Sequence, residues 1–245
     1  MIQIYQNIRG FYQTSLGRVT QRILRVRLRH FWPELTGKHV LAMGYPTPYL
    51  QAYLETALRL NIVMPPNMQE VHPWPPGSEN HVLVADETEL PYEDRMMDRI
   101  LMVHCLERSG DIMAALQEAW RVLDYDGRIL LVVPNRRGLW VRRDHTPFGH
   151  GVPFSQSQLR KILHEMGFTV EKMEQGLFMP PFENSFLHSM SPTLERLGAR
   201  FLDAFGGVYI VEASKQVFGG LPIAKAPKMR IRQKTVSAPD VSRRK

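Results

Sequence analysis

Three places in the sequence combine residue types that could bind or transform a ligand. The first is the turn Gly44-Tyr-Pro-Thr-Pro48, which follows an apolar run and precedes a segment with helical spacing. A helix that starts at the end of a strand directs backbone N–H groups at a ligand's negative groups, so this turn is a candidate binding site. The second is Asp86, an acidic residue that closes the apolar run at residues 81–85.

The third place is the loop over residues 135–153, which mixes cations with aromatic rings. Cations and rings together suit phosphate contact and base stacking, as in single-stranded nucleic acid binding. The same residues equally suit an acidic small substrate or a lid, which we favour. They are Arg136, Arg137, Arg142 and Arg143, interleaved with Trp140 and Phe148.

Metal and thiol chemistry find little support in the residue pattern. The single cysteine, Cys105, excludes an internal disulfide and a multi-thiolate metal site. We interpret it as a packed small residue at a strand end, since no base can be assigned to it. No histidine–carboxylate spacing supports zinc, and no P-loop, G-x-S-x-G or H-E-x-x-H pattern occurs, so we expect no metal.

The elements that must position these residues are strands and helices in alternation. Continuous apolar runs indicate strands that are buried on both faces, and a helix between two such runs makes a βαβ unit of a parallel sheet. The patterns predict an α/β fold. Predicted strands cover residues 38–44, 61–64, 81–85, 99–104, 128–134, 168–174 and 207–213, and predicted helices cover 49–60, 111–123, 155–166 and 193–205.

The charge of the chain is concentrated at its two ends. Residues 221–245 carry eight Lys and Arg against one Asp, and residues 1–40 carry seven against one Glu, whereas residues 41–220 are net negative. The composition predicts a basic amphipathic helix packed on the domain within residues 1–37, a domain over 38–218 and a disordered basic tail over 219–245. Arg18, Arg22, Arg25 and Arg29 form one stripe of that helix, either a solvated face or a phosphate-binding face.

Length and hydropathy set the remaining bounds. A chain of 245 residues suits one substantial domain, and no apolar run approaches the roughly 20 residues that span a bilayer. The N-terminus lacks the long apolar region of a secretory signal. With the single cysteine, these features favour a cytoplasmic location. The oligomeric state is left open.

One ordered set of motifs resembles a known family. The segments VADETELPYEDRMMDRILMVHCLE and ALQEAWRVLDYDGRILLVVPN, followed by His150-Gly-Val-Pro-Phe-Ser155 and Leu159 to Phe168, are similar to the class I S-adenosylmethionine-dependent methyltransferases with the type 11 domain. The resemblance spans residues 38 to about 215. It implies a Rossmann-like, seven-stranded, mostly parallel sheet with an antiparallel last strand, helices on both faces, and the cofactor over the C-terminal strand ends.

The resemblance also assigns residues to S-adenosylmethionine and to a small-molecule substrate. Asp86 is expected to accept a hydrogen bond from the adenine amino group, and His104 and Cys105 to lie near the methionine portion. The loop residues Asn135, Arg136 and Arg137 are expected to face the substrate. The full set of expected cofactor contacts is Ala42, Gly44, Tyr45, Asp86, Glu87, Thr88 and His104.

The first-strand turn departs from the family pattern. The family usually has D-x-G-x-G-x-G there, whereas this chain has Ala42 in place of the acid and Pro46 and Pro48 in place of two glycines. Prolines remove N–H donors and bring ring atoms into that space. The acid that closes the second strand is also missing, because Met64-Pro65 stands there; Glu70 in the following loop is a candidate replacement.

Two functions from different classes follow. The first is a methyltransferase, in which His104, His145 and His150 are candidate bases or substrate contacts. The second is a protein of this fold that has lost transfer chemistry and acts as a binding or scaffolding module. Nucleic acid binding through the basic ends remains a third possibility, and it would weaken steeply with salt.

Overall fold

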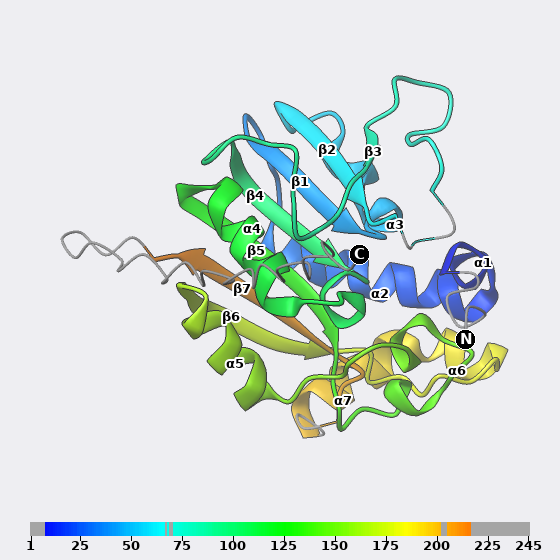
Figure 1. The fold of residues 1–245 in the computed structure, drawn as a ribbon. Helices are drawn as coiled ribbons and strands as arrows, with labels where there is room; N and C mark the ends of the chain where they lie inside the picture. The colour runs from blue at the N-terminus through cyan, green and yellow to red at the C-terminus, as the bar shows by residue number, and fades with distance from the viewer. Residues whose placement is uncertain (1–7, 67, 69–70, 202–204, 217–245) are drawn as a thin grey trace, which may run out of the picture.

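The computed structural model describes residues 8–66, 68, 71–201 and 205–216. Within them, seven strands form one sheet in the order β3-β2-β1-β4-β5-β7-β6 (Figure 1). The first five strands pair in parallel, and β7 is antiparallel to both of its neighbours. The predicted fold class, with its single antiparallel strand, is confirmed. The strands are β1 (His39–Gly44), β2 (Arg59–Met64), β3 (Val82–Val84), β4 (Met97–Val103), β5 (Leu123–Pro134), β6 (Phe168–Gly176) and β7 (Val208–Lys215).

Helices cover both faces of the sheet, because its central strands are apolar on both sides. On one face α4 (Ile112–Val122) and α5 (Gln156–Glu165) pack over residues such as Leu41, Ile100 and Leu131, none of which is exposed. On the other face α2 (Ser15–Phe31) and α7 (Ser191–Phe201) pack over residues such as Val40 and Leu130. Figure 1 shows α4 and α5 on the near side of the sheet and α2 behind it.

Local caps explain where several helices begin. The Thr14 side chain accepts a hydrogen bond from Gly17 N and starts α2. Ser155 and Gln158 form the predicted capping box of α5. Asp111 caps α4 through the amides of Met113 and Ala114. A short helix, α1 (Ile8–Gln13), precedes α2, and α6 (Ser185–Ser189) precedes α7.

The predicted helix over residues 49–60 is wrong for most of its length. Helix α3 (Thr47–Leu50) makes one turn, and a 3-10 turn (Gln51–Tyr53) follows it. Leu58 N then donates to Lys38 O, and β2 begins at Arg59 beside β1. Within the predicted helix, Arg59 and Leu60 pair with β1 and Ala57 forms an isolated bridge with Thr36, so tertiary contacts override the local pattern at its end.

The predictions for the two ends of the chain have different outcomes. The predicted amphipathic helix is α2, and its last residue is Phe31, two positions before Pro33. The predicted tail over residues 219–245 and Glu70 lie outside the described residues. The division of the chain after residues 37 and 218 stays a prediction. No helix within the described ranges is long and apolar enough to cross a membrane.

The packing of α2 gives a direct test of the fold. Leu24 is fully buried against the sheet, whereas Val26, two residues later, is 66% exposed. We expect Leu24→Ala to lower the free energy of unfolding by about 2–5 kcal/mol, because it leaves a cavity. Val26→Ala is the matched control, with an expected change within about 0.5 kcal/mol. Urea unfolding curves measure both values, and similar losses in the two variants would contradict the packing of α2.

Candidate active site at the carboxyl edge of the sheet

The turn after β1 contains one position, residue 44, at which the backbone requires glycine. Gly44 has a φ of +86°, and a Cβ atom there would lie 2.3 Å from the carbonyl oxygen of Val103 in β4. The next residue, Tyr45, donates its backbone N–H to the same oxygen at 2.7 Å. Glycine is therefore required because the turn approaches β4 closely and has a left-handed backbone.

Aromatic side chains fill the space in front of the ends of β1 and β4. Tyr12 of α1 stacks on Tyr45, with ring centroids 6.0 Å apart and planes 9° apart. Its hydroxyl lies 2.6 Å from the Tyr49 hydroxyl and 2.8 Å from Nε2 of His104. The ring of Phe148 lies 4.8 Å from the ring of His104. We call these five residues the aromatic cluster; all of them are buried.

His104 is a fully buried member of this cluster, between two protein partners. Its Nδ1 lies 3.3 Å from Oε1 of Glu107, and its Nε2 faces Tyr12. Burial lowers the pKa of His104, although the Glu107 carboxylate acts in the opposite direction. A neutral imidazole that donates from Nδ1 to Glu107 would accept at Nε2 from the Tyr12 hydroxyl. Both ring nitrogens then have protein partners, so the predicted base is enclosed in this arrangement.

The predicted adenine side lies at the sheet edge after β3. Asp86 is exposed, and its Oδ1 accepts from the amide of Thr88 at 2.8 Å and from the Thr88 hydroxyl at 2.7 Å. These hydrogen bonds lower the pKa of Asp86 and favour its ionised form. Glu87 is buried, and Ala42 is buried within β1. Asp86 therefore presents a charged acceptor to solvent at the position that the resemblance assigns to adenine.

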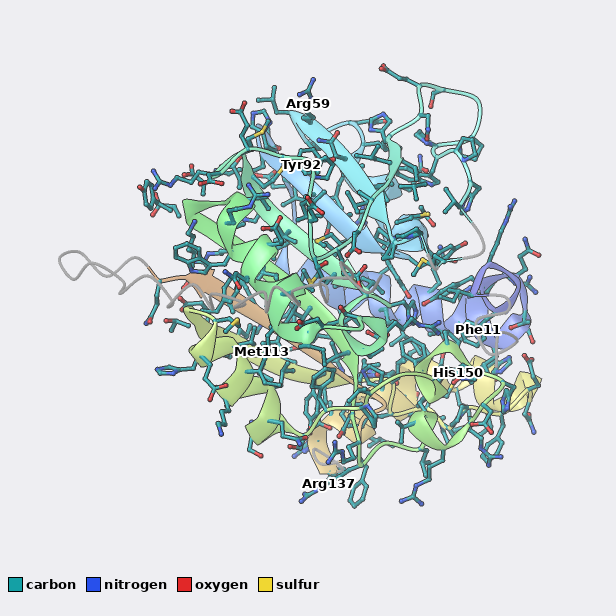
Figure 2. The ribbon with its side chains drawn as sticks, in the orientation of Figure 1. Phe11, Arg59, Tyr92, Met113, Arg137 and His150 are labelled. Carbon is teal, nitrogen blue, oxygen red and sulfur yellow. The ribbon has the colours of Figure 1, made fainter. Side chains whose placement is uncertain are left out.

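A cavity of about 570 Å³ lies beside the aromatic cluster. It brings together two of the predicted bases, His145 and His150, and Figure 2 shows His150 and Phe11 of α1 at this end of the molecule. Phe148 separates it from His104, because its ring also lies edge-on to Phe11, with centroids 6.5 Å apart. We call this cavity the histidine pocket; its chemically functional lining is Phe11, Arg108, Asp144, His145, His150 and Glu183.

The two histidines of this pocket differ in their surroundings. His150 Nε2 lies 2.6 Å from the carbonyl oxygen of Asp144, which can only accept, so Nε2 carries the proton. The Nδ1 atom of His150 is then the nitrogen that can take a proton. His145 is exposed at the pocket wall. The pocket therefore holds two imidazoles near the strand ends, which suits proton transfer from an acceptor.

The predicted substrate contacts lie elsewhere. Asn135 is fully buried, and its Nδ2 donates to the carbonyl oxygen of Gly206 at 2.7 Å, so it fixes the start of the loop. Arg136 donates to the carbonyl oxygen of Pro153. Arg137 lines a separate cavity with Arg160 of α5. None of the three is among the residues that line the histidine pocket.

Base stacking by the basic loop is excluded by burial. Trp140 and Phe148 are each 1% exposed, and Trp140 Nε1 donates to the carbonyl oxygen of Met179 at 2.8 Å. Arg143 lies over the ring of Phe182 at 4.8 Å. The stacking argument for nucleic acid at this loop was therefore wrong, because both rings belong to the core.

Sequence reasoning missed the residues that α1 contributes. Six residues are too few to show helical periodicity, so α1 was not predicted. The available signal was the aromatic pair Phe11-Tyr12, which is separated by one residue from Thr14, the cap of α2. Arg108 and Glu183 were also missed, and they reach the pocket only through long-range folding. No group of three or more potential metal ligands occurs among the residues that the structure describes.

A comparison with the sequence models of known families matches part of this chain. Residues 43–131 match the sequence model of a family described as "Methyltransferase domain". This match and the sheet order confirm the resemblance to the class I S-adenosylmethionine-dependent methyltransferases. A search of curated protein sequences gave no match.

Solved structures with this fold carry different activities in their names. A Thermotoga maritima protein described as a possible histamine N-methyltransferase is 19% identical, with a TM-score of 0.58, over 82% of this chain and 91% of the other. The Burkholderia thailandensis 1,6-didemethyltoxoflavin-N1-methyltransferase, solved with S-adenosylhomocysteine, is 16% identical, with a TM-score of 0.51, over 83% and 79%. The [4+2]-cyclase SpnF is 20% identical, with a TM-score of 0.55, over 82% and 83%. At these identities the likeness shows the fold alone.

The buried His104 predicts a pH dependence of stability. Its pKa is lowered in the folded state, so below the ordinary value of about 6.5 the unfolded chain binds a proton that the folded chain does not. The free energy of unfolding should therefore fall as the pH falls below about 6.5, by up to about 1.4 kcal/mol per pH unit from this group. Urea unfolding between pH 7.5 and 5.5 measures the slope. His104→Gln should have the shallower slope, and equal slopes would show that His104 is not the group responsible.

Proposed function

We propose that this chain is an S-adenosylmethionine-dependent methyltransferase that acts on a small molecule. The observation that carries the proposal is the family match over residues 43–131, which includes the Gly44 turn, Asp86 and His104. The histidine pocket supports it, because the pocket lies beside the aromatic cluster at the strand ends, and its 570 Å³ is a size typical of small-ligand sites.

The residues fit the cofactor at one end of its expected site and not at the other. Asp86 offers an ionised acceptor for the adenine end. At the methionine end, Tyr12 contacts His104 directly and stacks on Tyr45. Cofactor binding in this proposal therefore requires that Tyr12, and with it α1, moves away from His104.

Within the proposal, this chain's residues have three roles. Asp86 binds and orients the adenine end by a charge-assisted hydrogen bond. His150, with a proton on Nε2, accepts the acceptor's proton at Nδ1, and His145 on the same pocket is the other candidate. Phe11 and Phe148 form the apolar wall between this pocket and the aromatic cluster. S-adenosylmethionine supplies the methyl group when bound.

A second candidate is a protein of this fold without transfer chemistry. Two observations favour it: the aromatic cluster occupies the predicted methionine end, and Pro46 and Pro48 replace glycines in the turn. SpnF is a neighbour whose name describes a cyclase, so the fold does not by itself fix a reaction. Measured cofactor binding separates the two candidates.

Calorimetric titration with S-adenosylmethionine tests the cofactor site. We expect binding by the native chain, and about tenfold weaker binding by Asp86→Asn, since losing a charge-assisted hydrogen bond costs about 1.4 kcal/mol. Asp126→Asn is the matched control, because Asp126 is exposed near the amino-terminal end of β5, whereas Asp86 follows the carboxyl end of β3.

The variant Tyr12→Ala tests whether α1 closes the site. If Tyr12 must leave before the cofactor binds, its removal should tighten binding, because less of the free protein is in the closed state. The absence of heat at millimolar cofactor with both native and Tyr12→Ala protein would overturn the transferase proposal and favour the second candidate.

Transfer of a labelled methyl group tests the class of acceptor and the two histidines. After incubation with methyl-labelled S-adenosylmethionine and fractionated cell extract, we expect label in the small-molecule fraction. Removing the base as His150→Ala should reduce the rate by a factor of about 10²–10⁴, with His145→Ala as the parallel test. His164→Ala on α5, exposed and outside the pocket, should transfer at the native rate. Label only in protein or RNA would refute a small acceptor.

A further inference from the structure

A second large cavity lies on the α2 face of the sheet, and it shares no lining residue with the histidine pocket. It is a groove of about 800 Å³ between α2, α7 and β6. This volume falls within the range of small-ligand sites. Its lining is mainly apolar, from Ile23, Val26, Met173, Phe178, Pro192 and Ala199. We call it the α2–α7 groove.

Apolar side chains are also exposed on the helices that bound the groove. Val26 of α2 lines the groove and is 66% exposed. Leu197 and Phe201 of α7 are also exposed, but they are not among the residues that line the groove. The groove therefore offers an apolar ligand a floor that is open to solvent at Val26.

The charged residues of the groove include three arginines, Arg22, Arg27 and Arg196, and two glutamates, Glu174 and Glu195. Arg22 and Arg196 are exposed at its rim, and Arg27 lies deeper, with 22% of its side chain exposed. Arg27 lies 3.4 Å from Glu174 and 3.8 Å from Glu195, both longer than the 2.7–2.9 Å of a charge-assisted hydrogen bond. No counter-charge for Arg22 occurs within the described parts of the chain. The groove thus has positive charge available at its rim.

Glu195 adds a buried polar atom to the groove. It is 7% exposed, its Oε1 accepts from the amide of Met179 at 3.0 Å, and its Oε2 is buried without a hydrogen-bond partner among the described residues. Burial raises the pKa of Glu195, which favours the protonated carboxyl. A protonated carboxyl can donate a hydrogen bond, so Oε2, which lies 3.8 Å from Arg27, is available as a donor to a ligand's oxygen.

We propose that the α2–α7 groove binds an amphiphile with an acyl chain and an anionic head group. The acyl chain lies over Ile23, Val26 and Phe178. The carboxylate or phosphate head group lies between Arg22 and Arg196, within reach of Arg27. Glu174 and Glu195 both lie beside Arg27, whereas Arg22 and Arg196 are exposed at the rim. A neutral apolar ligand would leave these two rim charges unused, and a cationic amphiphile would be repelled by them. The inference does not depend on the proposed methyl transfer, because the two sites are separate.

Binding of sodium dodecanoate below its micelle concentration tests the groove in the full chain. We expect saturable calorimetric binding of dodecanoate, at least tenfold weaker binding of dodecyltrimethylammonium, and no binding of acetate. Ala199→Trp should weaken dodecanoate binding at least tenfold, because Ala199 is exposed on α7 and an indole there fills the groove without entering the core. The double variant Arg22→Glu, Arg196→Glu should weaken it similarly.

The matched control is Arg160→Glu, which changes an exposed arginine of α5 on the other face of the sheet. It should bind dodecanoate as the native chain does, and far-ultraviolet circular dichroism should be unchanged in every variant used. Equal binding by native and Ala199→Trp protein, or equal binding of the anionic and cationic amphiphiles, would overturn the proposal. The proposal would also be overturned if dodecanoate failed to bind while native and Ala199→Trp protein bound phosphatidylglycerol vesicles equally. That result would assign the surface to a bilayer.

Discussion

The contact between Tyr12 and His104 decides the state of the candidate site. His104 is fully buried at the end of β4, with a φ of +52° and a carboxylate, Glu107, on its other side. A polar group buried in this way is costly unless it is hydrogen bonded, so the Tyr12 hydroxyl satisfies a requirement that the fold creates. This contact, together with the stacking of Tyr12 on Tyr45, holds α1 against the end of the sheet where a ligand would enter.

The rest of the edge is arranged around that contact. Gly44 lets the turn after β1 approach Val103, and this approach places Tyr45 under the ring of Tyr12. Tyr49, on the single turn of α3, completes the hydrogen bonding of Tyr12. Pro46 and Pro48 suit this arrangement, because a turn that packs against protein rings has less need of backbone donors than one that binds a ligand. The departure from the glycine-rich pattern and the presence of α1 are therefore two parts of one structure.

The sequence was sufficient to predict the strands of the sheet, but not the residues that gather at their carboxyl ends. Runs such as residues 99–104 and 128–134 predicted strands correctly because Ile100 and Leu131 are buried, and burial on both faces leaves a local signature. The helix predicted over residues 49–60 was wrong beyond its first turns, because Ala57 bridges to Thr36 and Arg59 and Leu60 pair with β1, contacts that no local pattern records. His145 and His150 were proposed separately, and only folding brings both into one pocket with Phe11, whose helix is too short to predict.

The balance of free energies at Tyr12 controls whether the proposed site is open to a cofactor. Moving α1 away breaks the hydrogen bonds of Tyr12 to Tyr49 and His104 and exposes the stacked rings. If that opening costs about 3 kcal/mol, the apparent affinity for any ligand of the open state falls by roughly a hundredfold. A cofactor that donates a hydrogen bond to Asp86 and replaces Tyr12 at His104 can offset this cost; one that gains only the Asp86 contact cannot. In the proposed function, cofactor binding therefore depends on whether the ligand satisfies the buried His104 in place of Tyr12, more than on the sequence of the turn.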